Sequence, residues 1–201
     1  MNRFEFTPAL ETGNRDIDAH VRTLFAIANE ILYSKALEES PHEFRRALKF
    51  FVAYLDYHFA SEEVVMAKRH YPSRHLHAAF HAQVIHEADD IAIRVNSGGA
   101  SEESRDALYF MVEDWLTYHV QDADRQFADF LRETPAAEAT ERLPSIRDLK
   151  ASGSLSPDFD EQMLERVDAL GQLDHLPWIS PSSEPAQVSP SGPLATSAKA
   201  L

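Results

Sequence analysis

The sequence predicts an all-α fold, an up-down-up-down four-helix bundle with an N-terminal arm and a Pro/Ser-rich C-terminal tail containing one short helix. Two observations lead to this prediction. Apolar residues recur every three or four positions through four stretches of about 20 to 30 residues between residues 16 and 133. Short segments rich in Pro, Ser and Gly separate these stretches, so each helix is expected to turn back along the one before it.

The first helix is expected from about Asp16 to about Glu38, where the apolar pattern fades. The preceding residues, 1–15, have no helical period and are expected to form an arm across the domain. The second helix should open at a capping box, Ser40-Pro41-His42-Glu43, with Pro at the first helical position, and run to about Arg69.

The third helix is expected over about residues 73–95, after the turn Tyr71-Pro72-Ser73 and before the stop signal Asn96-Ser97-Gly98-Gly99. The fourth should cover about residues 102–133, with Ser101 as its N-cap. We therefore predict that residues 1–134 form the bundle.

Residues 135–201 are predicted to be linker and tail, because eight of the eleven prolines lie there. An apolar stripe, Phe159, Met163, Leu164, Val167 and Leu170, predicts an amphipathic helix at about residues 157–170. This helix either docks on its own bundle or contacts a protein partner or a second copy of the chain. From residue 181 onward we expect disorder.

The composition narrows the classes of function. A net charge of −14 over 201 residues argues against nucleic-acid binding, which requires a basic surface. The absence of cysteine excludes disulfides, thiolate metal sites and thiol catalysis. No signal-peptide pattern and no long uncharged apolar run is present, so we expect no membrane span and a cytoplasmic location.

Histidines and carboxylates predict a metal centre. Two pairs, His58 with Glu62 and His77 with His81, have i,i+4 spacing, which puts both side chains on one helix face. With alternating helix directions, these pairs lie level with three further donors, His20, His119 and Asp124. Seven donors are too many for one transition metal and suit two. Imidazole and carboxylate without sulfur favour iron, with manganese and zinc behind it.

The separation of His119 and Asp124 by five positions is wrong for a regular helix, because it turns the second side chain roughly 140° from the first. A local widening of the π-helical kind is predicted there. The other histidines, His42, His70, His75, His86 and His175, are interpreted as surface residues. The Glu39-to-His42 match to a ferritin-like diiron motif lies in a turn and has no second copy.

Together, the segments around His20, His58–Glu62, His77–His81 and 115–124 resemble the ligand motifs of the hemerythrin family, bacterial branch, over about residues 4–132. The resemblance implies that His77, His81 and His119 hold one iron and that His20 and His58 hold the other. Glu62 and Asp124 would bridge the two irons with an oxo or hydroxo group, and Phe59, Trp115 and Leu116 would line an O2 pocket. Phe4 or Phe6 stands in place of the family's usual N-terminal Trp.

The function that this resemblance implies is reversible O2 binding by two iron ions, as a carrier, store or sensor rather than an enzyme. The alternative is an enzyme on the same centre that reduces peroxide or nitric oxide, or donates iron for repair. A third hypothesis is a structural four-helix module whose histidines are incidental.

Overall fold

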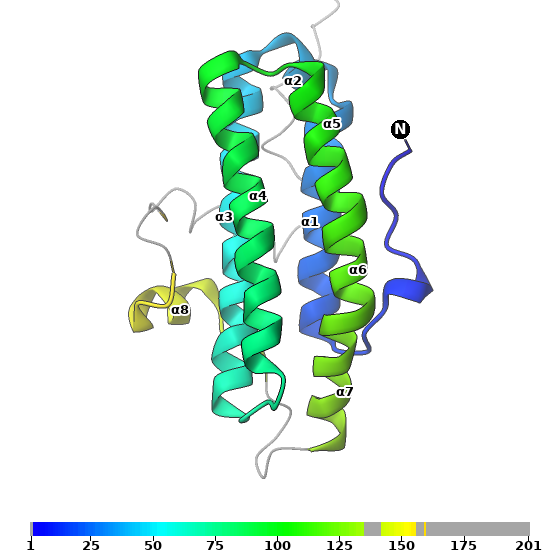
Figure 1. The fold of residues 1–201 in the computed structure, drawn as a ribbon, viewed down its shortest axis with the longest axis vertical. Coiled ribbons are helices and arrows are strands. Elements are labelled where there is room, and N and C mark those ends of the chain that lie inside the picture. Colours follow the sequence, from blue (N-terminus) through cyan, green and yellow to red (C-terminus); the bar gives the residue numbers. More distant parts are fainter. Residues whose placement is uncertain (1, 135–141, 156–158, 160–201) are drawn as a thin grey trace, which may run out of the picture.

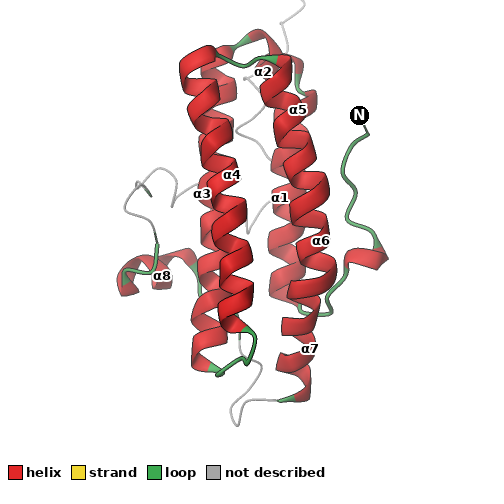
Figure 2. Ribbon diagram, in the orientation of Figure 1, coloured by secondary structure: helices red, strands yellow, loops and turns green. Residues whose placement is uncertain are grey.

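The computed structural model describes residues 2–134, 142–155 and 159, except for the side chains of Ala36 and Trp115. Within these ranges the regular structure is helical, and the long helices pack side by side (Figures 1 and 2). The bundle consists of α1 (Arg15–Tyr33), α3 (Pro41–Lys68), α4 (Arg74–Gly98) and a fourth rod that begins with α5 (Glu102–Phe110). Helix α1 packs on α3 and α5, and α4 packs on α3 and α5. The predicted four-helix bundle is confirmed.

The first predicted helix is interrupted, contrary to our expectation of a continuous helix to Glu38. Helix α1 ends at Tyr33, Ser34 is extended, and a separate short helix, α2 (Lys35–Glu39), follows. Arg105 reaches across from α5 and donates to the carbonyl oxygens of Ile31 (2.8 Å) and Leu37 (3.3 Å). The interruption leaves backbone carbonyls without helical partners, and the guanidinium of Arg105 supplies the N–H donors that satisfy two of them.

Local chemistry sets the remaining helix ends. Ser40 caps α3 by accepting from the Glu43 backbone N–H at 3.4 Å, while the Glu43 carboxylate faces His42 and Arg46 rather than completing the predicted box. At the other end, His70 takes a left-handed conformation (φ 53°) and Tyr71 N–H bonds to Met66 O, a Schellman arrangement. Helix α4 then continues three residues beyond the predicted end, to Gly98.

The N-terminal arm lies on the bundle as predicted. It contains a short 3-10 turn, η1 (Pro8–Leu10), and the backbone N–H and C=O of Phe4 both bond to the amide of Asn29, at 2.8 Å each. The Phe4 ring stacks on Phe25 of α1 and Tyr109 of α5. The arm therefore covers the seam between the first and fourth rods.

One described element was missed from the sequence. Helix α8 (Ile146–Ser152) opens with a capping box between Ser145 and Asp148 and packs against α3 (Figure 1). Ile146 and Leu149 are buried there. The helix predicted at about 157–170 and the disorder predicted after residue 181 lie outside the described residues, apart from Phe159, and the predicted boundary at residue 134 stays a prediction.

Candidate metal centre

The fourth rod is widened where the sequence predicts it. Two π-helical segments, η2 (Met111–Leu116) and η3 (Val120–Asp124), flank the short helix α6 (Thr117–His119), and α7 (Arg125–Glu133) completes the rod. The Thr117 N–H bonds to the carbonyl oxygen of Val112, five residues back, and its hydroxyl donates to the same oxygen at 3.2 Å. The second widening turns His119 and Asp124 toward the same interior point, which confirms the predicted π-bulge.

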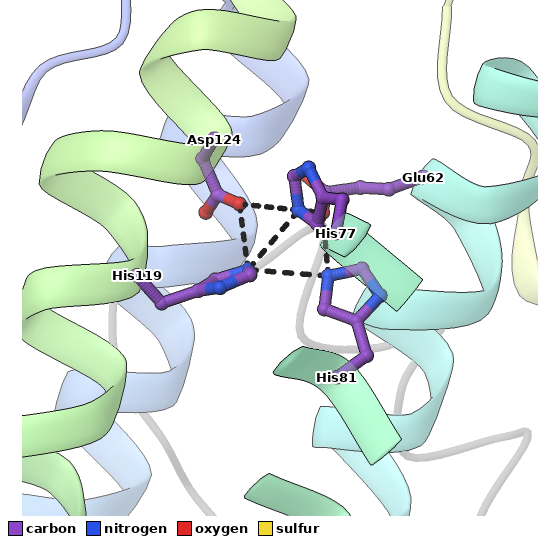
Figure 3. Close-up of side chains that lie close together, drawn as sticks. All are labelled: Glu62, His77, His81, His119 and Asp124. Carbon is purple, nitrogen blue, oxygen red and sulfur yellow. Dashed lines mark hydrogen bonds and ion pairs between the residues drawn. The ribbon is translucent and has the colours of Figure 1, made fainter. Parts of the chain in front are cut away.

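Five of the predicted ligands meet in the interior of the bundle (Figure 3). Glu62 comes from α3, His77 and His81 come from α4, and His119 and Asp124 come from the fourth rod. One ligand atom from each lies within 4.8 Å of all the others, and all five side chains are buried. Among the described residues this group has the composition and density of a metal site.

The three imidazoles of this group converge at distances that suit either hydrogen bonds between the rings or shared coordination of one ion. His119 Nε2 lies 3.2 Å from His77 Nε2 and 3.1 Å from His81 Nε2. Two ligands at right angles, each about 2.1 Å from one ion, are about 3 Å apart. The spacing therefore fits three nitrogens on one face of a single ion.

The two carboxylates reach beyond the three imidazoles. Asp124 Oδ1 lies 2.8 Å from His119 Nε2, whereas its Oδ2 faces His58 Nε2 at 3.9 Å. Glu62 Oε2 lies 3.3 Å from His81 Nε2 and 3.5 Å from His77 Nε2. Asp124 thus directs one oxygen to the three-histidine group and the other toward the opposite side of the site, which is the orientation of a bridging ligand.

His20 and His58 form that opposite side. Their rings lie 5.5 Å apart in an edge-on arrangement, and neither belongs to the group of five. His58 is fully buried, His20 is half-buried, and Nδ1 of both lacks a hydrogen-bond partner. The structure therefore brings all seven predicted ligands to one region of the bundle, as five convergent donors with His58 and His20 beside them.

The unsatisfied polar atoms support a bound cation. Both carboxylate oxygens of Glu62 and of Asp124 and both ring nitrogens of His58 are buried without a hydrogen bond of proper geometry. Leaving such groups unpaired costs several kcal/mol each in an apolar core. A metal ion satisfies acceptor-only carboxylates and imidazole lone pairs together, so the donor set fits a metal.

Burial and neighbouring charges raise the pKa of some of these histidines and lower that of others. Burial lowers the pKa of His77, but the nearby carboxylates of Asp124 and Glu62, 3.2 and 3.5 Å from its Nε2, outweigh it and raise that pKa to about 9. Burial, together with His58, lowers the pKa of His20 to about 3, and burial also lowers the pKa of His58. Burial opposes ionisation of Asp124, but His119 and His77 hold its pKa well below the usual value.

A further residue, Glu63, supports the centre and was missed from the sequence. Its Oε1 lies 2.9 Å from His81 Nδ1, so the ring donates its Nδ1 proton there and presents Nε2 to the group of five. Only the pairing of α3 with α4 reveals this role, because in sequence Glu63 is one of two adjacent glutamates.

Of the expected pocket residues, Phe59 lies beside the centre. The Phe59 ring stacks on His81 (3.9 Å between centroids, 10°) and lies 5.4 Å from His58 and 5.6 Å from His119. Leu116 is buried in the core. Trp115 belongs to η2, but its side chain is outside the described part, so its role stays a prediction. His42, His70, His75 and His86 are exposed, as expected, and His175 is not among the described residues.

Comparison with known proteins agrees with this geometry. Residues 12–131 match the hemerythrin family, described as the Hemerythrin HHE cation binding domain. A bacteriohemerythrin of Methylococcus capsulatus is 30% identical over 114 residues, which cover 57% of this chain and 84% of that protein. A bacteriohemerythrin of Ralstonia nicotianae is 25% identical over 131 residues, covering 65% and 90%. No solved structure matches at the significance these two reach, and no described helix could span a membrane. With its matched segment spanning most of the bundle, the chain belongs to the hemerythrin family.

Proposed function

We propose that the protein binds O2 reversibly at two iron ions, as a carrier, store or sensor. The observation that carries the proposal is the position of Asp124, which faces His77 and His119 with one oxygen and His58 with the other. His77, His81 and His119 would hold one ion, His20 and His58 the other, and Glu62 and Asp124 would join them. An iron pair supplies, when bound, the two electrons that O2 takes up.

The surrounding residues favour binding over chemistry. Among the described residues, His20 and His58 offer two imidazoles on one side against three on the other, so an ion held there would keep a coordination position open for a small ligand. Phe59 packs against rings from both sides and offers no hydrogen-bond donor. A dry apolar wall keeps water and stray protons from a bound gas molecule, which is the condition for its release unchanged.

The direct test is spectroscopic. Protein loaded with ferrous iron without air should develop a visible charge-transfer band when O2 is added and lose it again on deoxygenation. The His77→Ala variant should lose iron and the band, whereas the exposed-site control His86→Ala should retain both. Irreversible oxidation of the wild-type protein at the first exposure to O2 would contradict reversible binding.

One observation favours a second function, an enzyme on the same centre that reduces peroxide or nitric oxide or donates iron for repair. Two tyrosines lie beside His20, with ring centroids 4.8 Å (Tyr57) and 6.0 Å (Tyr54) from it. Burial raises the pKa of Tyr54 to about 12, so its phenol keeps its proton. Phenols next to a metal can donate an electron and a proton to a bound oxidant.

The two functions separate in a turnover assay. With a supplied reductant, the enzyme hypothesis predicts continuous peroxide or nitric-oxide consumption that falls in Tyr57→Phe, with iron content unchanged. O2 binding predicts no sustained consumption and the same reversible band in that variant.

A further inference from the structure

A groove on the outside of the bundle has no part in the proposed function. It lies between α3 and α4, with a volume of about 600 Å3, and its apolar lining includes Val52, Ala53, Ile85 and Ala92. Ile93, also in the lining, is 63% exposed. A hollow of this size with a large exposed aliphatic side chain at its edge has the character of a binding surface.

The α3 side of the groove is basic. Three basic residues, Arg45, Arg46 and Lys49, line it against one acidic residue of α3, Asp56, and Arg46 pairs with Glu43 at 3.0 Å. The α4 side adds one acidic residue, Asp89, so the basic end of the groove is the part between Arg45 and Lys49. A concentration of positive charge is unusual in a chain with a net charge of −14. The groove therefore suits an occupant with an apolar face and an acidic edge.

The chain itself enters this groove after α8. Phe159 lines the groove and is only 6% exposed, so the backbone has reached the groove at residue 159. The sequence continues for 42 more residues, to Leu201. Whatever directly follows Phe159 thus starts at the groove, at a high effective concentration.

The segment that follows has the matching pattern. Met163, Val167 and Leu170 continue from Phe159 at helical spacing, on one face. Residues 160–170 carry four acidic side chains, Asp160, Glu161, Glu165 and Asp168, against one basic side chain, Arg166. The groove is also long enough, because as a helix this segment spans roughly 15 Å and the groove follows α3 from His42 to Asp56 for roughly 21 Å.

We propose that residues 160–170 of this chain dock in the α3/α4 groove as an amphipathic helix, with their acidic side chains against Arg45, Arg46 and Lys49. Phe159 is the first anchor of the apolar stripe. The docked segment clamps α3 to α4, the two helices that supply His58, Glu62, His77 and His81.

Hydrogen exchange of the full chain tests this docking. In the wild-type protein the amides of 160–170 should exchange about tenfold or more slowly than unstructured amides. Reversing the charge of the basic groove residues with Arg45→Glu and Lys49→Glu should bring the exchange of these amides to within about twofold of unstructured rates. Adding Glu161→Lys and Glu165→Lys to that variant should restore protection. The control pair Arg15→Glu and Arg74→Glu, with the same change of charge away from the groove, should leave protection intact.

Unprotected amides in the wild type, or protection insensitive to this charge reversal, would overturn the proposal. Protection that disappears on dilution, with a dimer seen by sedimentation, would assign the groove to a second copy instead and would overturn it too. Iron content, measured alongside, reports the metal centre separately.

Cross-linking gives a second readout that does not depend on the charge variants, because the chain has no native cysteine. Val52→Cys with Met163→Cys should form an intramolecular disulfide at least about tenfold faster than Val52→Cys with Gln162→Cys, whose side chain leaves another face. Equal rates, or disulfides only between chains, would contradict docking within one chain.

Discussion

Metal binding should displace protons from the three-histidine group, and the number displaced should fall as the pH rises. The reason lies in His77 and His81, where burial opposes protonation but the adjacent carboxylates raise both pKa values, that of His77 to about 9. A metal ion needs the unprotonated imidazole, so these protons must leave when the ion enters.

The magnitude follows from the pKa of His77. At pH 7 a group with a pKa of about 9 is unprotonated in roughly one molecule in a hundred, which opposes metal binding by about 3 kcal/mol. Apparent affinity should therefore rise about tenfold per pH unit from this residue alone, and more steeply with His81. His20 and His58, whose pKa values burial lowers, are neutral at pH 7 and release nothing.

Titration calorimetry of the metal-free protein, in buffers of different ionisation enthalpy, measures the protons released per ion. With the ion supplied from a weak chelator, release should be greater at pH 7.0 than at pH 9.5 by about 0.75 proton from His77, and by more if His81 adds to it. A hydroxide bridge formed from water would add to the count at both values, so the difference isolates the imidazoles. Equal release at the two pH values would refute this account of the group.

Three further predictions concern support, acidity and packing. Glu63→Gln should weaken iron affinity about 10- to 100-fold in a chelator competition, because Glu63 orients His81. The exposed control Glu102→Gln should leave the affinity unchanged. Equal affinities of the two variants would show that Glu63 does not orient His81. The metal-free protein should be most stable near pH 6.5. The stability contributed by His77 is fully present below pH 6.5 and is lost as the pH rises through about 9. The stability contributed by His20 is fully present above pH 6.5 and is lost as the pH falls toward about 3. Denaturant midpoints that rise steadily from pH 5 to pH 9 would contradict this. Leu116→Ala, at a fully packed position, should cost about 2–5 kcal/mol of unfolding free energy and speed oxidation of the iron in air; an unchanged oxidation rate would separate Leu116 from the pocket.

The sequence contained most of the bundle and of the candidate centre because both depend on periodic spacing. An i,i+4 pair such as His77 and His81 fixes which face a side chain leaves, whatever the neighbours do. The five-residue spacing of His119 and Asp124 predicted a local distortion as well, because only a widened helix brings both side chains inward. The η3 segment has that widening.

Features that depend on contacts between distant segments could not be read in this way. The break at Ser34 is stabilised by Arg105, 71 positions later, and Glu63 acts on His81 across a helix interface. Helix α8 had a readable signal, because Ser145 and Asp148 have capping-box spacing, but its apolar residues are too few to show a period. Local pattern predicts elements, and tertiary contacts decide where they break and what supports a ligand.

Iron content per chain is the measurement closest to the central claim, that the seven donors hold two ions. Protein reconstituted without air and freed of loose metal should contain about two irons per chain. The His77→Ala and His58→Ala variants should each lose at least one, since these residues lie on opposite sides of the carboxylates. A wild-type ratio of one iron or fewer, or full content in both variants, would contradict the claim.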